Sequence, residues 1–572
     1  MNNLKTIWSD SPDTTAYPRP QMVRDSYQPL DGAWDYKIEK GDLSLVPSKD
    51  GIYDGKIVVP FSPESMLSGV NRTLAPDEVL TYRTFFPRLE NKTALLHFGA
   101  VDYACKVYVN GSFVTSHTGG YTPFECEIDQ FLIADKNELV VCVTDPSDSA
   151  PISRGKQALR HGGIWYTPTS GIWQSVWIEY LPKSYIKHVE IAPDFDSKTV
   201  KITAITNTGS KNFEVLADSK RFVSSNGSVT LDCSDKKPWT PEDPSLYPFE
   251  VVHGEDKTGC YYALRKFSVG RRKDGRFCFM LNDKPYFMTG LLDQGYWSDG
   301  LYTAPSDEAL VYDIELAKKC GFNTLRKHIK VEPLRWYYHC DRLGMIVWQD
   351  FVNGGGKYNP FAILLLPNIG IHVKDDNYAF YARKDETGRK LYYEEMKEIV
   401  TLLRNSSCVA LWTPFNEGWG QFDSLKTCEY LRSLDDTRLI DHASGWSDQG
   451  GEYRSIHKYF VPFRMPGREK RPVILTEFGG YSMKIEDHAF SDKIFGYAIF
   501  KDGDKLNAAL KKLWTKELLP AKEKGLCASI YTQLSDVQSE VNGLVTYDRR
   551  VVKVDIAMMK ELNERLCKEY SE

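Results

Sequence analysis

Apolar and polar residues alternate in short runs through the first half of the chain. In residues 1–182, runs such as "KVYVNGSFVTSHTGG", "NELVVCVTD" and "GIWQSVWIEYL" are separated by Asp, Pro and Gly. Asn110-Gly111 in the first run is typical of a two-residue β-hairpin turn. Many short strands joined by polar turns predict a β-sandwich or jelly roll for 1–182. Residues 183–270 repeat the pattern over a length that suits a seven-strand immunoglobulin-like sandwich.

Helical spacing begins in the second half, from residue 271 onward. In "SDEALVYDIELAKKCG", Leu310 and Ile314 lie on one apolar face, Ser306 can cap the amino end, and Gly321 can end the helix. Apolar runs with the length of strands alternate with such helices. The eight predicted strands are 285–292, 322–328, 345–351, 408–415, 438–444, 455–459, 472–477 and 527–533.

Eight β/α units over residues 271–572 predict a C-terminal (β/α)8 TIM barrel. The linker between residues 444 and 455 is too short for a helix, so one unit is expected to lack it. A doubly wound open sheet is the alternative, but no Gly-rich phosphate-binding sequence follows the first predicted strand. The predicted fold class is a multidomain β and α/β protein with an N-terminal jelly roll, an immunoglobulin-like β-sandwich and a TIM barrel.

Polar residues follow every predicted strand of the barrel, and in this fold the chemistry lies at the carboxyl ends of the strands. The candidates at these ends are Asp293, Arg326, His328, Asp350, Asn416, Glu417, Trp446, His457, Tyr459, Glu477, Tyr531 and Gln533. A single polar residue at a strand end is usually a turn former or a cap, and Asp350 can equally pair with Arg326 as a structural ion pair. No His-x-His or acidic spacing indicates a metal site, so we expect no metal.

Two carboxylates stand out: Glu417 in "PFNEGWG" and Glu477 in "VILTEFGG". Both follow long apolar strands, so both are expected to be partly desolvated. Most glycoside hydrolases catalyse the reaction with a pair of carboxyl groups, of which one is protonated and the other ionised. The negative charge of one raises the pKa of the other, and burial raises it further. Asn416 can donate to a sugar hydroxyl near the reacting carbon.

These motifs resemble those of glycoside hydrolase family 2, the family of β-galactosidase, β-glucuronidase and β-mannosidase. "GAVDYACKVYVNGSFVTSHTGGYTPFE" and "TSGIWQSVWIE" resemble its sugar-binding jelly roll, and "DIELAKKCGFNTLRKH" resembles the start of its barrel. The resemblance implies a retaining mechanism with Glu417 as acid/base and Glu477 as nucleophile. It also implies substrate contacts from Asn416, His328, Tyr459 and Trp446. Strand 8 of the family often carries a tryptophan platform for the sugar ring, where this chain offers Tyr531.

Two departures from the family narrow the expected substrate and cofactor. The large β-galactosidases bind magnesium through an acidic residue and a His after strand 3, but "WQDFVNGGG" lacks that His. The β-glucuronidases carry an Asn-x-Lys pair, but no lysine lies two positions after Asn542. We therefore expect a terminal β-galactoside and no cofactor. The alternatives are α-L-arabinosides, galactofuranosides, β-mannosides and, less favoured, β-glucuronides; a non-catalytic carbohydrate-binding protein; and a metal-dependent hydrolase.

Composition excludes some other classes of function. The net charge is −5, the pI is about 6.2 and no long basic run occurs, which argues against nucleic-acid binding. No apolar run reaches the ~18 residues of a membrane span, and "MNNLKTIWSDSPDTTAYPRP" has no apolar signal core, so a cytoplasmic protein is expected. Twelve scattered cysteines predict reduced thiols.

The expected partner is a small carbohydrate, and homo-oligomers are usual in the family. Aromatic-rich loops at 354–390 and 481–503 could wall the aglycone side, make a subunit contact, or be ordinary packed insertions.

Overall fold

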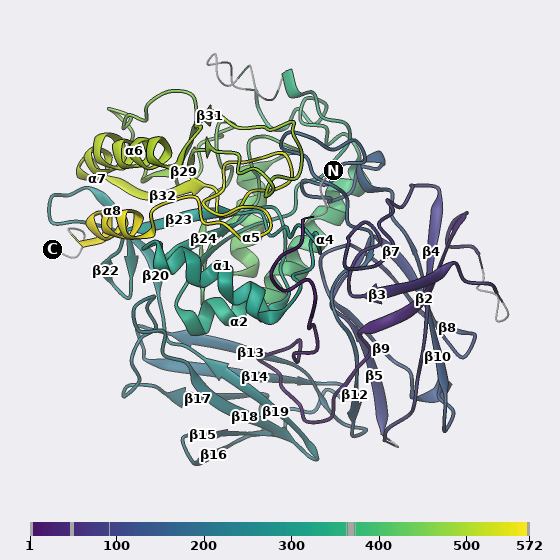
Figure 1. The fold of residues 1–572 in the computed structure, drawn as a ribbon. Coiled ribbons are helices and arrows are strands. Elements are labelled where there is room, and N and C mark those ends of the chain that lie inside the picture. Colours follow the sequence, from purple (N-terminus) through teal and green to yellow (C-terminus); the bar gives the residue numbers. More distant parts are fainter. Residues whose placement is uncertain are drawn as a thin grey trace.

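Two antiparallel sheets pack face to face in the amino-terminal part of the chain (Figure 1). The strand order is β1-β12-β5-β9 in one sheet and β3-β2-β4-β10-β7-β8 in the other, and β6 pairs with β11 beside them. The computed structural model describes residues 4–45, 51–90, 92–361, 363, 366, 371 and 373–568. The strands of this part are β1 (Gln28–Pro29), β2 (Gly32–Lys40), β3 (Gly55–Val59), β4 (Glu78–Phe86), β5 (Thr93–Phe98), β6 (Val101–Asp102), β7 (Ala104–Val109), β8 (Ser112–Thr118), β9 (Phe124–Glu127), β10 (Asn137–Thr144), β11 (Gly171–Ile172) and β12 (Val176–Leu181).

Buried side chains such as Trp34, Phe98 and Val141 fill the space between these two sheets. At the predicted hairpin, Asn110 and Gly111 have φ angles of 51° and 76°, as a type I′ turn requires, and β7 pairs with β8. The predicted β-sandwich and its hairpin are confirmed.

A smaller sandwich follows, with three strands (β13-β14-β17) packed on four (β16-β15-β18-β19). Its core contains Val189, Val215 and Val251. The predicted seven-strand sandwich is confirmed, and a three-stranded sheet, β20-β21-β22, leads into the barrel. These strands are β13 (Ile186–Asp194), β14 (Thr199–Thr206), β15 (Phe213–Ala217), β16 (Lys220–Ser224), β17 (Ser228–Asp232), β18 (Tyr247–His253), β19 (Asp256–Tyr262), β20 (Phe267–Arg271), β21 (Phe277–Leu281) and β22 (Lys284–Pro285).

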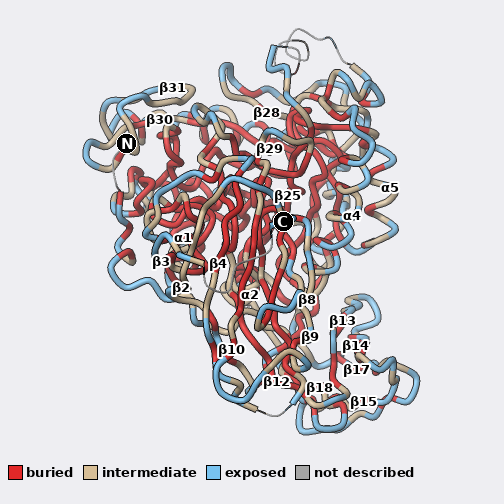
Figure 2. Tube along the Cα trace, turned by 90° about the vertical axis from the view of Figure 1, so that its right-hand side faces the viewer, coloured by how far each residue is buried: buried red, intermediate tan, exposed pale blue. Residues whose placement is uncertain are grey.

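Eight parallel strands form the barrel, in the order β27-β26-β25-β24-β23-β32-β29-β28. Each overlaps one of the eight predicted strands, and the predicted TIM barrel is confirmed. Their side chains belong to the largest buried cluster, shown in red through the centre of the molecule in Figure 2. The strands are β23 (Met288–Asp293), β24 (Thr324–Lys327), β25 (Ile346–Asp350), β26 (Val409–Thr413), β27 (Leu439–Ile440), β28 (Arg454–Lys458), β29 (Val473–Gly479) and β32 (Leu526–Thr532); the short pair β30 (Tyr481–Ser482) and β31 (Ala498–Ile499) lies in the loop after β29.

Helices surround the barrel where the sequence has apolar stripes of helical period. Ser306 caps α1 by accepting from the Ala309 amide, Gly321 follows its end with φ of 81°, and Leu310 and Ile314 are buried, as predicted. The described helices are α1 (Asp307–Lys319), α2 (Leu334–Leu343), α4 (Glu386–Leu403), α5 (Ser424–Leu434), α6 (Gly503–Leu513), the π-helix η4 (Trp514–Leu518), α7 (Leu519–Glu523) and α8 (Ile556–Lys568), with two short 3-10 helices, η1 (Asp129–Phe131) and η2 (Ser147–Ser149), in the first sandwich.

The backbone ladder of the barrel is open between β27 and β28, the two ends of the strand order; we call this gap the seam. Residues 441–453, all of them described, contain no helix, as the short linker predicts. Side chains span the seam instead. Ser455 Oγ donates to Asp441 Oδ2 at 2.9 Å, and Ser444 Oγ lies 2.9 Å from His457 Nε2.

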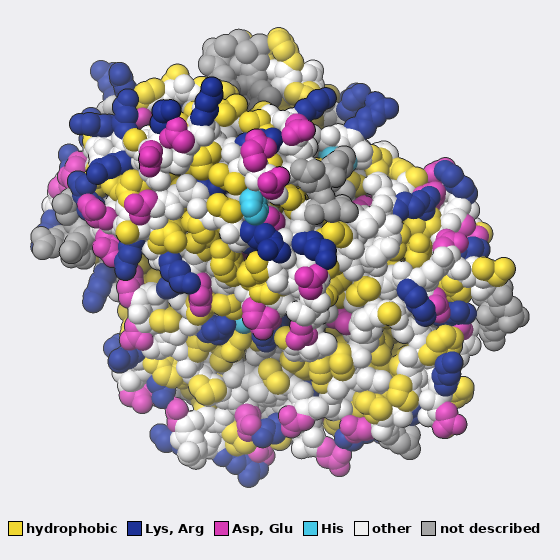
Figure 3. All heavy atoms as spheres, in the orientation of Figure 1, with side chains coloured by type: hydrophobic (Ala, Val, Ile, Leu, Met, Phe, Trp, Pro, Cys, Tyr) yellow, Lys and Arg dark blue, Asp and Glu magenta, His cyan; other side chains and the backbone are white. Residues whose placement is uncertain are grey.

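The surface, the helices and the thiols can be compared with the composition. Figure 3 shows basic and acidic side chains interspersed over one face of the molecule. None of the helices in the described part of the chain has both the length and the apolar character needed to cross a bilayer. All twelve cysteines are unpaired, and most are buried.

Candidate active site

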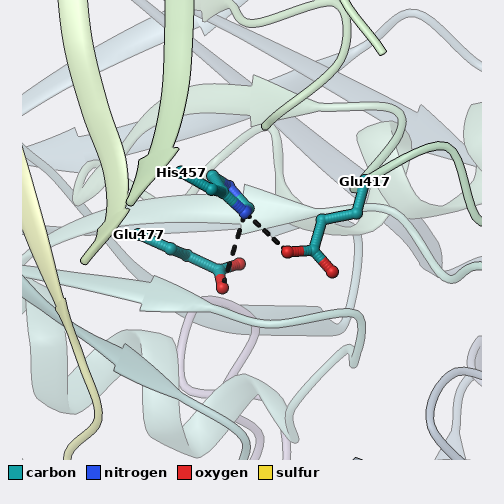
Figure 4. A group of neighbouring side chains, drawn as sticks. All are labelled: Glu417, His457 and Glu477. Atoms are coloured by element: carbon teal, nitrogen blue, oxygen red, sulfur yellow. Dashed lines mark hydrogen bonds and ion pairs between the residues drawn. The ribbon is translucent and has the colours of Figure 1, made fainter. Parts of the chain in front are cut away.

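Glu417, just after β26, and Glu477, in β29, meet at the carboxyl ends of the barrel strands, with His457 of β28 between them (Figure 4). One carboxylate oxygen of each glutamate and one ring nitrogen of His457 lie within 4.8 Å of one another. His457 Nδ1 is 2.7 Å from Glu417 Oε1 and 3.7 Å from Glu477 Oε2. Both glutamates are buried, with 7% and 4% of their surface exposed. The structure therefore brings the two predicted carboxylates together.

The backbone of "PFNEGWG" explains why glycines flank the tryptophan. Glu417 itself has φ of 54°, an uncommon conformation for a residue with a side chain, and its amide donates to the Ser444 carbonyl at 2.7 Å. Gly418 and Gly420 also have positive φ. A Cβ on Gly418 would lie 2.5 Å from Ser447 Oγ, and one on Gly420 would lie 2.0 Å from the Gly354 carbonyl oxygen. Both positions require glycine for the turn that presents Glu417.

Arg326 of β24 connects the polar residues at four strand ends. Its guanidinium donates to Asp350 at 3.0 and 3.1 Å, to Glu477 Oε1 at 3.0 Å and to Asn416 Oδ1 at 2.9 Å. His328 Nδ1 lies 2.8 Å from Asp350 Oδ2. Arg326 is completely buried, so this network fixes the positions of Glu477 and Asn416.

Two buried polar atoms of this network have no protein partner among the described residues: Asn416 Nδ2 and His328 Nε2. Burial holds the pKa of His328 well below its usual value, so the ring is neutral. Because Asp350 takes the Nδ1 hydrogen, Nε2 of His328 is an acceptor. The site thus keeps one amide donor and one imidazole acceptor free for a ligand.

Aromatic residues surround the two glutamates. The Tyr459 hydroxyl donates to Glu477 Oε2 and lies 3.0 Å from Thr532 Oγ1. The ring of Tyr497 stacks on Tyr459 at 4.0 Å, so the predicted loop 481–503 contributes to the site. Trp446 Nε1 donates to the Glu417 carbonyl at 3.1 Å, and its ring contacts His457 edge-on.

A loop of the amino-terminal sandwich, residues 153–170, lies against the same end of the barrel. Tyr166 donates to Glu540 Oε2 at 2.6 Å, and Trp165 meets Trp419 edge-on at 5.4 Å. Lys156 is only 8% exposed, yet within the described part of the chain no carboxylate lies at ion-pair distance from its ammonium group. Sequence reasoning missed these residues; the cluster "GIWY" in a segment without strand alternation was the available signal.

Charges around the site set the pKa values of its carboxyls. Burial raises the pKa of Glu417, and a proton on His457 Nδ1, together with the Lys156 ammonium, lowers it; with that proton in place, the pKa lies below its usual value. Burial also raises the pKa of Glu540, and the Lys156 ammonium opposes this rise. The Lys156 ammonium therefore lowers the pKa of both carboxyls.

The remaining predicted site residues divide into two groups. Gln533 donates to Glu540 at 3.1 Å and to Asn542 at 2.7 Å, and so supports the site. Asp293 forms an ion pair with Lys327. Tyr531 packs against Phe478 and Trp514 and points its hydroxyl at the Tyr481 amide. The structure does not bring Asp293 and Tyr531 to the two glutamates, and we leave both out of the proposed site.

Two further regions were compared with the site: the predicted loop 354–390 and a cavity elsewhere in the protein. The predicted loop 354–390 includes residues 362, 364, 365, 367–370 and 372, which lie outside the described residues; its described part places Tyr358 against Trp165 and Trp419. A cavity of about 630 Å³ between the first sandwich and α1, α2 and α4 is lined by none of the predicted site residues.

The sequence matches two profiles of one family. The profile described as "Glycosyl hydrolases family 2, sugar binding domain" matches residues 28–182, and "Glycosyl hydrolases family 2, TIM barrel domain" matches residues 273–484. A β-galactosidase of Thermoanaerobacter pseudethanolicus is 25% identical over 386 residues, covering 62% of this chain and 47% of the relative. The chain spans about half the length, or less, of the first curated relatives that it matches.

Solved structures share the fold over nearly the whole chain. A β-D-glucuronidase of Dictyoglomus thermophilum superimposes with a TM-score of 0.72 at 18% identity, covering 96% of this chain and 98% of its own. A β-galacturonidase of Eisenbergiella tayi, bound to galacturonate, has a TM-score of 0.69 at 16% identity, covering 96% and 99%. At these identities the likeness concerns the fold alone. The two family profiles show that this chain belongs to glycoside hydrolase family 2.

Proposed function

We propose that this protein is an exo-acting glycoside hydrolase that retains anomeric configuration, with Glu477 as nucleophile and Glu417 as acid/base. The observation that carries the proposal is the distance between their carboxylate oxygens, within 4.8 Å. Retaining enzymes place the two carboxyl groups about 5–5.5 Å apart, whereas inverting enzymes need about 6.5–9.5 Å to admit a water molecule. The separation here supports direct attack by one carboxylate on the sugar.

The surroundings of the two glutamates support this assignment of roles. Arg326 and Tyr459 both donate to Glu477, an arrangement that suits an ionised nucleophile held in place. Glu417 contacts His457 instead and has no arginine partner in the described structure. The free Asn416 amide and the His328 acceptor are suited to sugar hydroxyls.

The stereochemistry of the first product tests the retaining mechanism. With a β-linked nitrophenyl substrate, the sugar released first is expected to be the β anomer, because two displacements restore the starting configuration. Proton NMR of the anomeric region during the first minutes of turnover separates this signal from that of the slowly formed α anomer. Initial release of the α anomer would contradict the role of Glu477.

The sugar that we propose is a terminal β-galactosyl residue of a small oligosaccharide or glycoconjugate. The name of the Thermoanaerobacter relative supports this choice. The solved neighbours named for uronic acids share the fold at 16–18% identity. A second buried carboxyl argues against an acidic sugar: burial raises the pKa of Glu540 and the negative charge of Glu477 raises it further, while the Lys156 ammonium opposes the rise. We expect these two carboxyls to repel the carboxylate of a uronate.

A matched pair of substrates tests the preference for a neutral sugar. Nitrophenyl β-galactoside and β-galacturonide differ only at C6, and the native enzyme is expected to favour the galactoside by at least about 100-fold in kcat/KM, because juxtaposed like charges cost several kcal/mol. Glu540→Gln should reduce the ratio of kcat/KM for the galactoside to that for the galacturonide about tenfold, because it removes one negative charge.

Tyr166→Phe is the control, because it removes the hydrogen bond to Glu540 but leaves the charge. An unchanged ratio in Glu540→Gln would overturn this role of Glu540. The same assay extended to glucuronides, mannosides, arabinosides and galactofuranosides ranks the alternative sugars, and activity is expected to persist in EDTA.

A further inference from the structure

His457 lies where it controls the proton of Glu417, because its Nδ1 is 2.7 Å from Glu417 Oε1 (Figure 4). One hydrogen must lie between these two atoms. If it belongs to Nδ1, it stabilises the ionised carboxylate and makes Glu417 a weak acid. If it belongs to the carboxyl, Glu417 is ready to protonate a leaving group. In a neutral ring only one nitrogen carries a hydrogen, so a hydrogen held on Nε2 leaves Nδ1 as an acceptor and places the shared hydrogen on the carboxyl.

The other nitrogen, Nε2, begins a chain of hydroxyl groups that crosses the seam. Ser444 Oγ lies 2.9 Å from His457 Nε2, and Ser444 donates to Thr476 Oγ1 at 2.8 Å. Thr476 Oγ1 is 2.7 Å from Ser455 Oγ, which donates to Asp441 Oδ2 at 2.9 Å. All five residues are buried, so the described side chains make these bonds with one another.

The direction of the chain follows from the number of hydrogens. A hydroxyl has one hydrogen, and an ionised carboxylate only accepts. Ser455 gives its hydrogen to Asp441, so Thr476 must donate to Ser455. Thr476 also lies 3.4 Å from the Ile456 carbonyl, but donation there would leave the 2.7 Å contact with Ser455 without a hydrogen. Ser444 then donates to Thr476 and has only a lone pair for His457.

We propose that Asp441, through Ser455, Thr476 and Ser444, holds the hydrogen of His457 on Nε2, leaves Nδ1 bare, and thereby assigns the shared hydrogen to the Glu417 carboxyl. This inference rests on the proposed role of Glu417 as acid/base. His457 acts as a positioning residue, since it touches Glu417. The neutral pair also avoids placing an imidazolium and a carboxylate together in a buried site, which is costly.

Each proton and bond in the two half-reactions is accounted for. In the first, the bond from the sugar to Glu477 forms, the bond to the leaving oxygen breaks, and the Glu417 hydrogen moves to that oxygen. The Glu417 carboxylate then faces the bare lone pair of Nδ1, which increases its affinity for a proton. In the second, water attacks the sugar, the bond to Glu477 breaks, and one water hydrogen returns to Glu417.

Other charges also face this pair. Within the described residues, the ionisable groups near His457, besides Glu417, include Glu477, Asp350, Asp441, His328 and Tyr459. Arg326 pairs with Glu477, and the Lys156 ammonium favours the ionised form of Glu417. The bare Nδ1 of His457 has the opposite effect to Lys156, because it favours the protonated form of Glu417. Burial raises the pKa of Asp441, so the chain loses its anchor when this carboxyl gains a proton at low pH.

Thr476→Val tests the chain, because valine has nearly the same shape but no hydroxyl. Without this chain of hydroxyl groups, Nδ1 of His457 can carry a hydrogen. The pKa of Glu417 then falls, because that hydrogen stabilises the ionised carboxylate. The alkaline limb of kcat/KM should move down by about one pH unit. Hydrolysis of an alkyl glycoside, whose leaving group needs a proton, should fall at least tenfold, and that of a dinitrophenyl glycoside less than threefold. Thr476→Ser keeps the hydroxyl and should behave as the native enzyme.

Equal losses on both substrates with an unmoved alkaline limb would overturn the proposal. If Thr476→Val does not fold, Ser444→Ala breaks the chain at its next member. Neutron diffraction from deuterium-exchanged crystals of the native enzyme tests the assignment directly: deuterium is expected on His457 Nε2 and on Glu417. Deuterium on Nδ1 would contradict it. Failure of the proposed function would show differently, as unchanged turnover in Glu417→Gln.

Discussion

Glu477→Gln should lose hydrolytic activity almost completely, with kcat reduced by at least about 10⁴-fold. Glutamine has the shape of glutamate, so its Oε1 can still accept from Arg326 and its Nε2 can donate to the Tyr459 hydroxyl, but it cannot form the covalent bond to the sugar. Steady-state rates with a nitrophenyl β-galactoside measure the effect, and thermal unfolding should show an intact fold. Glu452→Gln, at an exposed ion pair with Arg432, is the matched control and should keep full activity.

Azide, a small anionic nucleophile, can be used to identify the role of the carboxylate removed at position 477. In Glu477→Ala, azide can attack from the vacated face in one displacement, so the product should be an α-glycosyl azide. Activity of Glu477→Gln close to that of the native enzyme would contradict the assignment of Glu477, whereas a native protein that hydrolyses none of the glycosides would favour a non-catalytic carbohydrate-binding protein. Rescue of this variant with a β-azide product would instead make Glu477 the proton carrier.

Glu417→Gln should show the second-largest effect, and its size should depend on the leaving group. Proton donation contributes about 10²–10⁴-fold, so hydrolysis of an alkyl glycoside should fall by this factor. A dinitrophenyl glycoside needs no proton, so its covalent intermediate should still form and then accumulate, because no base activates water. A burst of dinitrophenol followed by slow turnover, recorded by stopped-flow absorbance, is the expected result.

Azide again provides the control. In Glu417→Ala the nucleophile is intact, so azide should attack the covalent intermediate and give a β-glycosyl azide at an increased rate. Equal losses for good and poor leaving groups, without a burst, would show that Glu417 does not transfer the proton.

The order of elements was predictable because it depends on local pattern. The eight barrel strands, the cap at Ser306 and the turn at Asn110-Gly111 follow from hydrophobic period and from residues that suit particular φ angles. The pairing of Arg326 with both Asp350 and Glu477 was partly predictable, because parallel strands bring their carboxyl ends to one edge.

Contacts between distant segments were not predictable from a single sequence. Lys156 and Tyr166 reach the site from the first sandwich; the cluster "GIWY" marks the segment as unusual, but its local pattern does not show which distant residues it meets. The misplacement of Tyr531 has a geometric cause. Side chains of a strand alternate, and Thr532 is the residue of β32 that contacts Tyr459, so its neighbour Tyr531 faces the helical layer.

The seam also bears on the dynamics of the protein. Barrel strands are usually protected by ladders on both sides, but β27 and β28 each have a backbone partner on one side only. Regions with fewer backbone bonds open locally at a lower free energy than the core, so this part of the barrel should be the first to fluctuate. The side-chain bonds from Asp441 to His457 resist that opening. Barrel closure and the protonation of Glu417 would therefore be lost together on heating, before the protein unfolds as a whole.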